Sequence, residues 1–266
     1  MKSDYCGKEP DLGYRYNVSV SSYFNQDRQI IPCDAFLENV IKMIVRGKGE
    51  TILQEEELQK LYILGVTGCS GVGKTTFVRE LDKIALAEQN RKVYVYHFDV
   101  YWMDIMYENK QELIAKFGEK MFKPDGGYDD NYFNSCDREQ HREYMLKIAP
   151  EIVNRFYRSA EKEEDANGIY VADFWHLPLT PLWERCNKRV IVKSNAEERH
   201  DRLENRDYCP CSPAEAKIRD EIFEDAWKST NTVDCLEIYN DYSEGLHSIA
   251  RAVYSDIQKE NHFGKC

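Results

Sequence analysis

The segment that most constrains this chain is a glycine-rich octapeptide at residues 68–75, which reads Gly-Cys-Ser-Gly-Val-Gly-Lys-Thr. It follows an apolar run at 61–67 and precedes a stretch in which Phe77, Leu81 and Ile84 recur at helical spacing. A G-x-x-x-x-G-K-[ST] turn between a strand and a helix is typical of a phosphate-binding loop, or P-loop. The pattern therefore predicts an α/β fold that binds a nucleotide.

Each part of this loop has a physical role in holding phosphate. The glycines let backbone N–H groups turn around a phosphate, and the helix that follows adds partial positive charge. We predict that Lys74 reaches the β- and γ-phosphates of ATP and that Thr75 binds the accompanying Mg²⁺. The predicted ATP-binding residues of the loop are Gly68, Cys69, Ser70, Gly71, Val72, Gly73, Lys74, Thr75 and Thr76.

Composition limits the partners and the compartment. The chain has 36 Lys and Arg against 47 Asp and Glu, a net charge of -11, so no nucleic-acid partner is expected. No apolar run approaches the roughly 18–20 residues of a membrane helix, and the first residues do not resemble a signal or transit peptide. The nine cysteines are scattered without Cys-x-x-Cys spacing, which is typical of reduced thiols. We therefore expect a cytoplasmic protein with no membrane partner and no metal beyond magnesium.

Short apolar runs alternate with helical patterns from Leu61 onward. The predicted strands are 61–67, 93–98, 169–174, 189–193 and 234–239, an arrangement that indicates a parallel sheet flanked by helices. A helical pattern at 140–157 contains Pro150, which predicts a break or kink just before it. The last helix should bury one face, formed by Leu246, Ile249, Ala250, Val253 and Ile257.

These patterns divide the chain into three regions. Residues 1–60 form a predicted N-terminal extension in which Phe36, Val40, Ile41, Ile44 and Val45 recur at helical spacing. Residues 61–258 form the predicted P-loop kinase domain, with a helical lid at about 202–230, and 259–266 form a C-terminal tail. The extension could bind a partner protein.

An acidic residue follows the second predicted strand. The sequence His97-Phe98-Asp99 places a carboxylate at the C-terminal edge of the sheet, where open α/β folds bind their ligands. An Asp beside the phosphates can orient or accept the proton of an acceptor hydroxyl, as a small-molecule kinase requires. We therefore predict Asp99 as the catalytic base, acting with Lys74 and a lid arginine, Arg206.

Beyond these motifs, the order of landmarks from about Leu61 to Val253 resembles the dephospho-CoA kinase family. Those landmarks are the P-loop, Asp99, an F-G pair followed by a D-G pair, a helix proline, an acidic strand end with P-L-x-E, and an R-D pair that opens a lid. In this sequence they are Gly68 to Thr75, Asp99, Phe117-Gly118, Asp125-Gly126, Ala149-Pro150, Asp173 with Pro181 to Glu184, and Arg202 to Asp207.

The resemblance implies a role for several residues. The acceptor hydroxyl would be the ribose 3′-hydroxyl of dephospho-CoA, placed against Asp99. Substrate-binding residues would be Tyr101, Phe117, Gly118, Asp125, Gly126 and Asp173. A mobile lid carrying Arg202, Arg206 and Arg219 would close over the γ-phosphate, and Asn240, after the last strand, would contact adenine.

The sequence departs from the family pattern mainly on the acceptor side. The segment after the D-G pair, Gly127 followed by Tyr128 to Asn131, contains no Arg, Ala149 replaces a His before the proline, and no Gln stands near Phe223-Glu224. Two alternatives therefore remain. One is a nucleoside kinase, because Gly68 to Thr76 and Phe98 to Trp102 also resemble the uridine and nicotinamide riboside kinases. The other is a catalytically weakened ATP-binding module with a protein partner.

Overall fold

The computed structural model describes residues 61–88, 91–205, 210–228, 230, 234–241 and 245–262. The predicted N-terminal extension, and with it the helix expected near Phe36, lies outside these residues. So do Arg206, part of the predicted lid and the last four residues of the predicted tail. Among the described helices, none combines the length and the apolar character that crossing a membrane requires.

Five parallel strands form one sheet in the order β2-β3-β1-β4-β5. Their bounds are Tyr62–Thr67 for β1, Val93–His97 for β2, Ile169–Asp173 for β3, Lys188–Lys193 for β4 and Cys235–Tyr239 for β5. Every predicted strand is present with its ends displaced by one residue at most. The α/β fold predicted from the sequence is therefore confirmed.

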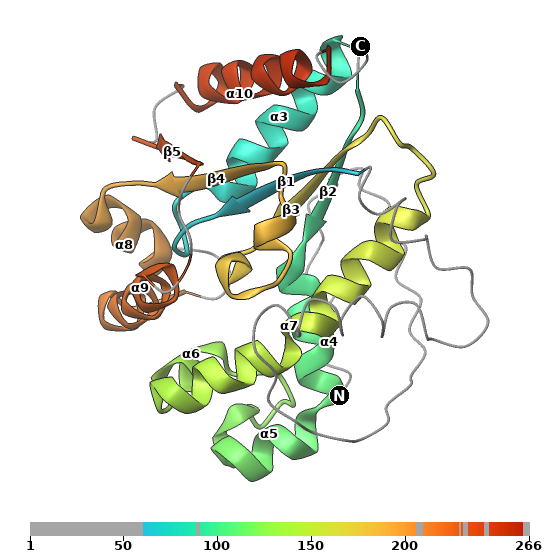
Figure 1. Ribbon diagram of the computed structural model, residues 1–266. Coiled ribbons are helices and arrows are strands. Elements are labelled where there is room, and N and C mark those ends of the chain that lie inside the picture. The colour runs from blue at the N-terminus through green and yellow to red at the C-terminus, as the bar shows by residue number, and fades with distance from the viewer. Residues whose placement is uncertain are drawn as a thin grey trace, which may run out of the picture.

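Helices cover both faces of the sheet (Figure 1). The long elements are α3 (Lys74–Glu88), α4 (Phe98–Glu108), α7 (Arg138–Glu161), α9 (Pro213–Lys228) and α10 (Gly245–His262). The shorter ones are α5 (Lys110–Phe117), α6 (Asp130–Ser135), α8 (Ala196–Glu204) and the 3₁₀ turns η1 (Glu119–Met121), η2 (Leu177–Leu179) and η3 (Trp183–Arg185). Helices α3 and α10 lie on one face of the sheet, and α4 and α7 lie on the other.

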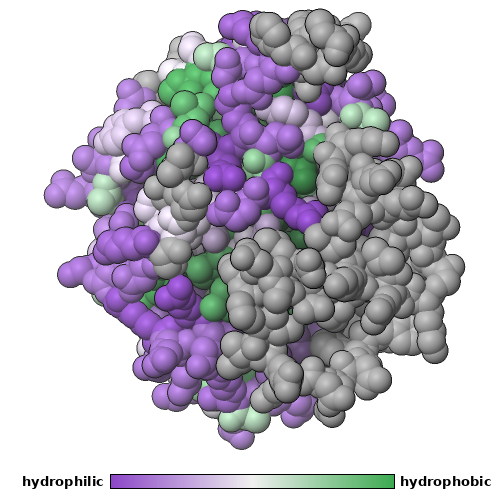
Figure 2. Space-filling view, viewed as in Figure 1, coloured by the Kyte–Doolittle hydropathy of each residue, from purple (hydrophilic) through white to green (hydrophobic). Residues whose placement is uncertain are grey.

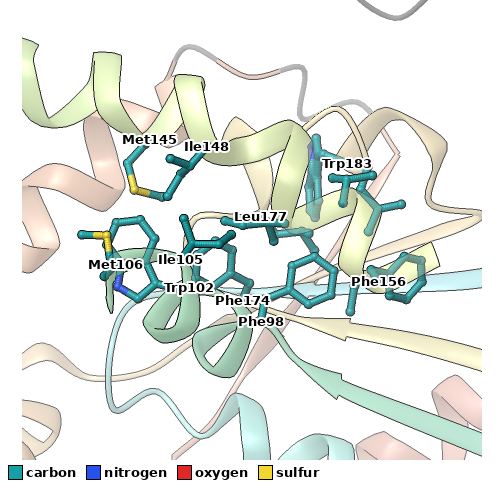
Figure 3. Close-up of a cluster of buried hydrophobic side chains, with 14 of the residues drawn as sticks. Phe98, Trp102, Ile105, Met106, Met145, Ile148, Phe156, Phe174, Leu177 and Trp183 are labelled. Carbon is teal, nitrogen blue, oxygen red and sulfur yellow. The ribbon is translucent and has the colours of Figure 1, made fainter. Parts of the chain in front are cut away.

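The alternation of side chains along β1 divides the core in two. Tyr62, Leu64 and Val66 pack with α3 and α10, whereas Leu61 and Ile63 belong to the cluster on the α4 and α7 side. Figure 3 shows this second cluster, in which Phe98 and Trp102 of α4 lie near Phe174 and Leu177, which follow β3. Because both faces are buried, the strands read as nearly continuous apolar runs.

Helix α7 corrects one prediction. It runs without interruption through Pro150, so of the predicted break or kink the break is wrong, and the kink stays a prediction. Its buried residues include Ile148, Ala149 and Ile152, which lie on both sides of the proline. Packing of this face against the core stabilises the helix across the lost backbone hydrogen bond. Leu146, whose carbonyl would have accepted that bond, is exposed.

The surface outside the core is mostly polar. Figure 2 shows that hydrophilic residues dominate the described part of the face in view, with smaller hydrophobic areas between them. The large apolar side chains that remain exposed in the described residues include Leu86, at 68%, on helix α3. Leu81, on the same helix, is fully buried.

These two leucines give a matched test of the core. Leu81→Ala should lower the free energy of unfolding by about 2–5 kcal/mol, because it leaves a cavity in a fully buried site. Leu86→Ala should change it by less than about 0.5 kcal/mol, since that side chain loses little contact. Urea denaturation measures both, and equal effects would contradict the burial of α3 against the sheet.

Candidate active site

The ends of three strands meet at one edge of the sheet. Asp173, the last residue of β3, is in register with Val66 of β1 and with His97 of β2. The P-loop follows β1, and Asp99 lies in the first turn of α4, directly after β2. The topology therefore brings together the loop, Asp173 and Asp99, which are far apart in the sequence.

Hydrogen bonds connect the P-loop to this edge. The Thr75 hydroxyl donates to Oδ2 of Asp173 at 3.1 Å, and Nδ1 of His97 lies 3.0 Å from the same oxygen. Asp173 is only 4% exposed, so these contacts orient a buried carboxylate beside the loop. The sequence predicted Asp173 as a substrate-binding residue, but its contact in the structure is with the residue predicted to bind magnesium.

Lys74 is bound to the loop that it follows. Its Nζ donates to the carbonyl of Gly68 at 2.9 Å and to the carbonyl of Cys69 at 3.1 Å. An ammonium group has three donors, so a third remains for a phosphate oxygen. Thr76, next in the chain, is exposed, and burial raises the pKa of the Cys69 thiol to about 12, which keeps it protonated.

The loop conformation requires glycine, most clearly at Gly73. This residue has φ +96°, and a Cβ atom there would lie 2.4 Å from Nδ2 of Asn240. That amide nitrogen donates to the carbonyl of Val72 at 2.8 Å, and Asn240 is 4% exposed. Asn240 thus supports the back of the P-loop. Its predicted contact with adenine stays a prediction.

Asp99 lies in an electrostatic environment that suits a base. Its side chain is reached by solvent, yet the protein atoms around it partly desolvate the carboxyl. This desolvation and the negative charge of Asp173 raise its pKa to about 6, while Lys74 and His97 oppose the shift. A carboxylate with such a pKa is ionised at neutral pH but accepts a proton readily.

The predicted lid arginines occupy different places. Arg202 is exposed on α8, and Arg206 lies outside the described residues. Arg219 on α9 is largely buried, and its Nη2 donates to Asp130 at 2.8 Å and also contacts Asn131. Arg219 therefore connects α9, which belongs to the predicted lid, to α6. The roles predicted for these arginines toward ATP stay predictions.

The predicted acceptor-side residues each pack, form a turn or make a hydrogen bond within the protein itself. Phe117 is buried against the rings of Phe133 and Tyr144, and Gly118 ends α5 with φ +96°. The turn at 123–127 is formed by Asp125, whose carboxylate accepts from the N–H of Gly127, and by Gly126 at φ +88°. The Tyr101 hydroxyl donates to Ser159 of α7. Contacts of these five residues with a substrate stay predictions.

Two clefts are lined in part by helix α9. One, of about 320 Å³, lies between α6 and α9 and is lined in part by Lys123, Asp129 and Asn134. The other, of about 550 Å³, lies between α7 and α9 and is lined by Arg138, Glu139, His141, Arg142, Leu179, Ile222, Asp225, Ala226 and Lys228. Arg138 of this lining pairs with Asp225, whereas Arg142, Lys228 and Glu139 have no ion-pair partner in the described part of the chain. Three basic residues against two acidic ones give the lining a small formal excess of positive charge.

A buried histidine lies at the bottom of the second cleft. His141 is 2% exposed, and its Nε2 has no hydrogen-bond partner among the described residues. Burial lowers the pKa of His141 to about 4, so the ring is neutral at pH 7. A buried polar atom without a partner carries a desolvation cost, and the neutral form of the ring keeps that cost lower than an imidazolium would.

Three charged residues near the P-loop were not predicted. They are Arg199 on α8, Asp220 on α9, which binds it, and Asp130 on α6, which binds Arg219. For Arg199 a signal existed. Leu203 is the large apolar residue of its helix and marks the buried face, and Arg199 lies four residues earlier on that same face.

Comparison with known proteins finds one family model and several solved structures that are similar to this chain. A family model described as an AAA domain matches residues 64–225. The crystal structure of TT1252 from Thermus thermophilus is similar, with a TM-score of 0.53, 19% identity, and coverage of 75% of this chain and 97% of that one. Shikimate kinase from Bacteroides thetaiotaomicron has a TM-score of 0.39 and 14% identity over 75% of this chain and 98% of its own. No curated protein matches the chain.

The Asn240 contact makes a prediction about nucleotide binding. Asn240→Asp keeps the shape of the side chain but replaces its N–H donor with an oxygen that faces the Val72 carbonyl. We expect the affinities for MgATP and MgGTP to fall together, by roughly tenfold, because a buried hydrogen bond to the loop is lost. Isothermal titration calorimetry measures both, and a loss confined to ATP would instead support the adenine contact.

Proposed function

We propose that this chain, which belongs to the AAA domain family, is an ATP-dependent small-molecule kinase. The observation that carries the proposal is the position of Asp99. Asp99 follows β2 at the sheet edge where the P-loop and Asp173 also lie, and the charges of Lys74 and Asp173 both act on its pKa. A phosphate-binding lysine and a base at one sheet edge are the two parts that phosphoryl transfer to a hydroxyl needs.

The donor half of the site holds the triphosphate of ATP. Lys74 offers an ammonium donor to the β- and γ-phosphates, and the loop N–H groups and the N-terminus of α3 add positive potential. The Thr75 hydroxyl and the Asp173 carboxylate are oxygen groups in contact with each other, the donor type that Mg²⁺ prefers. Magnesium bound there would neutralise charge on the phosphates.

The acceptor half activates a hydroxyl group. As the acceptor oxygen forms a bond to the γ-phosphorus, the bond from that phosphorus to the bridging oxygen breaks and ADP leaves. Asp99 accepts the hydroxyl proton, for which a pKa of about 6 is suited at neutral pH. His97 holds Asp173 against Thr75, so the donor and acceptor halves share one hydrogen-bonded edge.

Dephospho-CoA is the acceptor that we propose. The landmarks from the P-loop to Asn240, which follows the last strand, keep the order of that family, and its ribose 3′-hydroxyl would meet Asp99. The cleft between α7 and α9 is lined by three basic residues, Arg138, Arg142 and Lys228, against the two acidic residues Glu139 and Asp225, and this small excess of positive charge favours an anionic acceptor. The diphosphate of dephospho-CoA supplies such an anion, whereas a nucleoside carries none.

The acceptor is tested by measuring magnesium-dependent ADP release with dephospho-CoA, uridine, nicotinamide riboside or no acceptor. Stimulation by dephospho-CoA alone supports the proposal. Stimulation by a nucleoside alone would support kinase activity but would show that the acceptor is a nucleoside and not dephospho-CoA. A protein that binds ATP but is stimulated by none of them would contradict the kinase assignment and favour an ATP-binding module.

Removal of the base should affect chemistry and leave nucleotide binding unchanged. Asp99→Asn is expected to lower kcat by about 10²–10⁴-fold, the usual contribution of a general base, with MgATP affinity near that of the wild type. Asp104→Asn is the matched control, because Asp104 lies on the same helix and faces Arg155 instead. Near-normal turnover by Asp99→Asn would show that the base assignment is wrong.

The pH dependence of turnover follows from the raised pKa of Asp99. The carboxylate is the active form, so kcat should fall as pH decreases through about 6 and level off above about 7. An unperturbed aspartate would move this midpoint to about 4. Steady-state rates between pH 5 and 8 at saturating substrates test this, and a flat profile down to pH 5 would contradict it.

A further inference from the structure

We propose that Arg199 is a positioning residue for the P-loop, and that Asp220 of helix α9 holds Arg199 in place. The guanidinium group fixes the peptide between Ser70 and Gly71, so the position of α9 is transmitted to the loop. This inference rests on the proposed function only in that the loop binds the phosphates of ATP.

The contacts of Arg199 are numerous and buried. Its Nη1 donates to the carbonyl of Ser70 at 3.2 Å and to Oδ1 of Asp220 at 2.7 Å. Its Nη2 donates to Oδ2 of Asp220 at 2.6 Å, which completes a bidentate pair. Arg199 is only 4% exposed, unlike the predicted lid residue Arg202 on the same helix.

Asp220 is ionised and held from two sides. Nε2 of His200 lies 2.9 Å from Oδ2 of Asp220, the oxygen that also accepts from Arg199. Burial would raise the pKa of Asp220, but the hydrogen bonds from Arg199 and His200 lower it overall. The carboxylate therefore stays charged at neutral pH and keeps the guanidinium oriented toward the loop.

Packing brings the same helix face against Gly71. A Cβ atom on Gly71 would lie 3.0 Å from Cγ of Leu203 and 3.1 Å from Cγ of Arg199. Leu203 is fully buried in a small cluster with Cys211 and Ala216. Helix α8 therefore lies between the P-loop and α9, with Arg199 bridging all three.

The geometry of the peptide bond explains why the Ser70 carbonyl matters. All described peptide bonds are trans, and a trans peptide places its C=O and the following N–H on opposite sides. Anchoring the Ser70 carbonyl on Arg199 therefore fixes the direction of the Gly71 N–H within the loop. Gly71 has φ +82°, a conformation that glycine adopts without strain, and the bond from Arg199 to the preceding carbonyl restricts rotation of this peptide.

Helix α9 is also held on the acceptor side. Arg219, directly before Asp220, contacts Asp130 and Asn131 at the start of α6. The side chains of neighbouring helix residues point about 100° apart, so Asp220 can contact Arg199 of α8 while Arg219 contacts α6. Displacement of α9 would therefore move Asp220, and with it the guanidinium that anchors the loop.

The test compares Asp220→Asn with a matched control on the same helix. Glu221→Gln removes the same charge from α9 but breaks an exposed pair with Arg138 of α7 instead of the pair with Arg199 of α8. MgADP affinity is measured by calorimetry, and amide hydrogen exchange at residues 69–73 is measured in the nucleotide-free protein. For Asp220→Asn we expect affinity lower by roughly tenfold and faster loop exchange, because a charged hydrogen bond is lost.

The control should match the wild type in both measurements, and exchange in α10 should be unchanged in both variants. Wild-type affinity and wild-type loop exchange in a folded Asp220→Asn protein would overturn the proposal. Equal losses in Glu221→Gln would also overturn it, since they would reflect the charge or general loosening of α9.

A charge reversal distinguishes a role of Arg199 in positioning the P-loop from a role in stabilising the protein. The double variant Arg199→Asp with Asp220→Arg restores an ion pair between α8 and α9 but not the donor to Ser70. We expect its Tm to exceed that of either single variant while MgADP affinity stays low. Recovery of affinity together with Tm would overturn the proposal. If the wild type bound no nucleotide, the proposed function would fail, and loop exchange would still test the role of Arg199.

Discussion

The structure depends on the register of three parallel strands. Pairing of β3 with both β1 and β2 sets Asp173 beside Val66 and His97, so residues separated by about a hundred positions end at one edge. Shifting one strand by a single residue would reverse the face of every side chain on it. The hydrogen bond from Thr75 to Asp173 joins this register to the P-loop.

The two core layers keep that edge rigid. On one face, α3 carries the P-loop lysine at its start and packs against β1 and α10 through Phe77 and Leu81. On the other, Phe98 and Trp102 anchor the first turns of α4 in the aromatic cluster, and Asp99 lies between them in sequence. Buried side chains on both sides of Asp99 therefore hold an exposed carboxylate near the loop.

The fold could be predicted because its strands and helices follow local sequence patterns. Contacts between residues far apart in the sequence leave no such local pattern. The P-loop spacing, the apolar runs of the five strands and the face of α10 are encoded within short windows, and all are present. The helix break predicted before Pro150 is absent because tertiary packing of α7 outweighs a local helix-breaking preference.

Within the site, Lys74 and Thr75 could be assigned to the P-loop from its spacing, and Asp99 to the sheet edge because it follows β2. Their roles toward ATP and the acceptor stay predictions. Arg199 and Asp220 could not be paired in this way, since their contact depends on how two helices pack. Asn240 was recognised as a candidate, but its bond to Val72 became visible only in three dimensions.

The central claim is that one sheet edge holds the γ-phosphate of ATP between Lys74 and Asp99. A crystal structure with Mn²⁺ and a non-hydrolysable ATP analogue tests it most directly, because the anomalous signal of manganese locates the metal. The account predicts the triphosphate in the P-loop, the metal at Thr75 and Asp173, and the γ-phosphate facing Asp99. A nucleotide bound elsewhere, or a γ-phosphate directed away from Asp99, would contradict it.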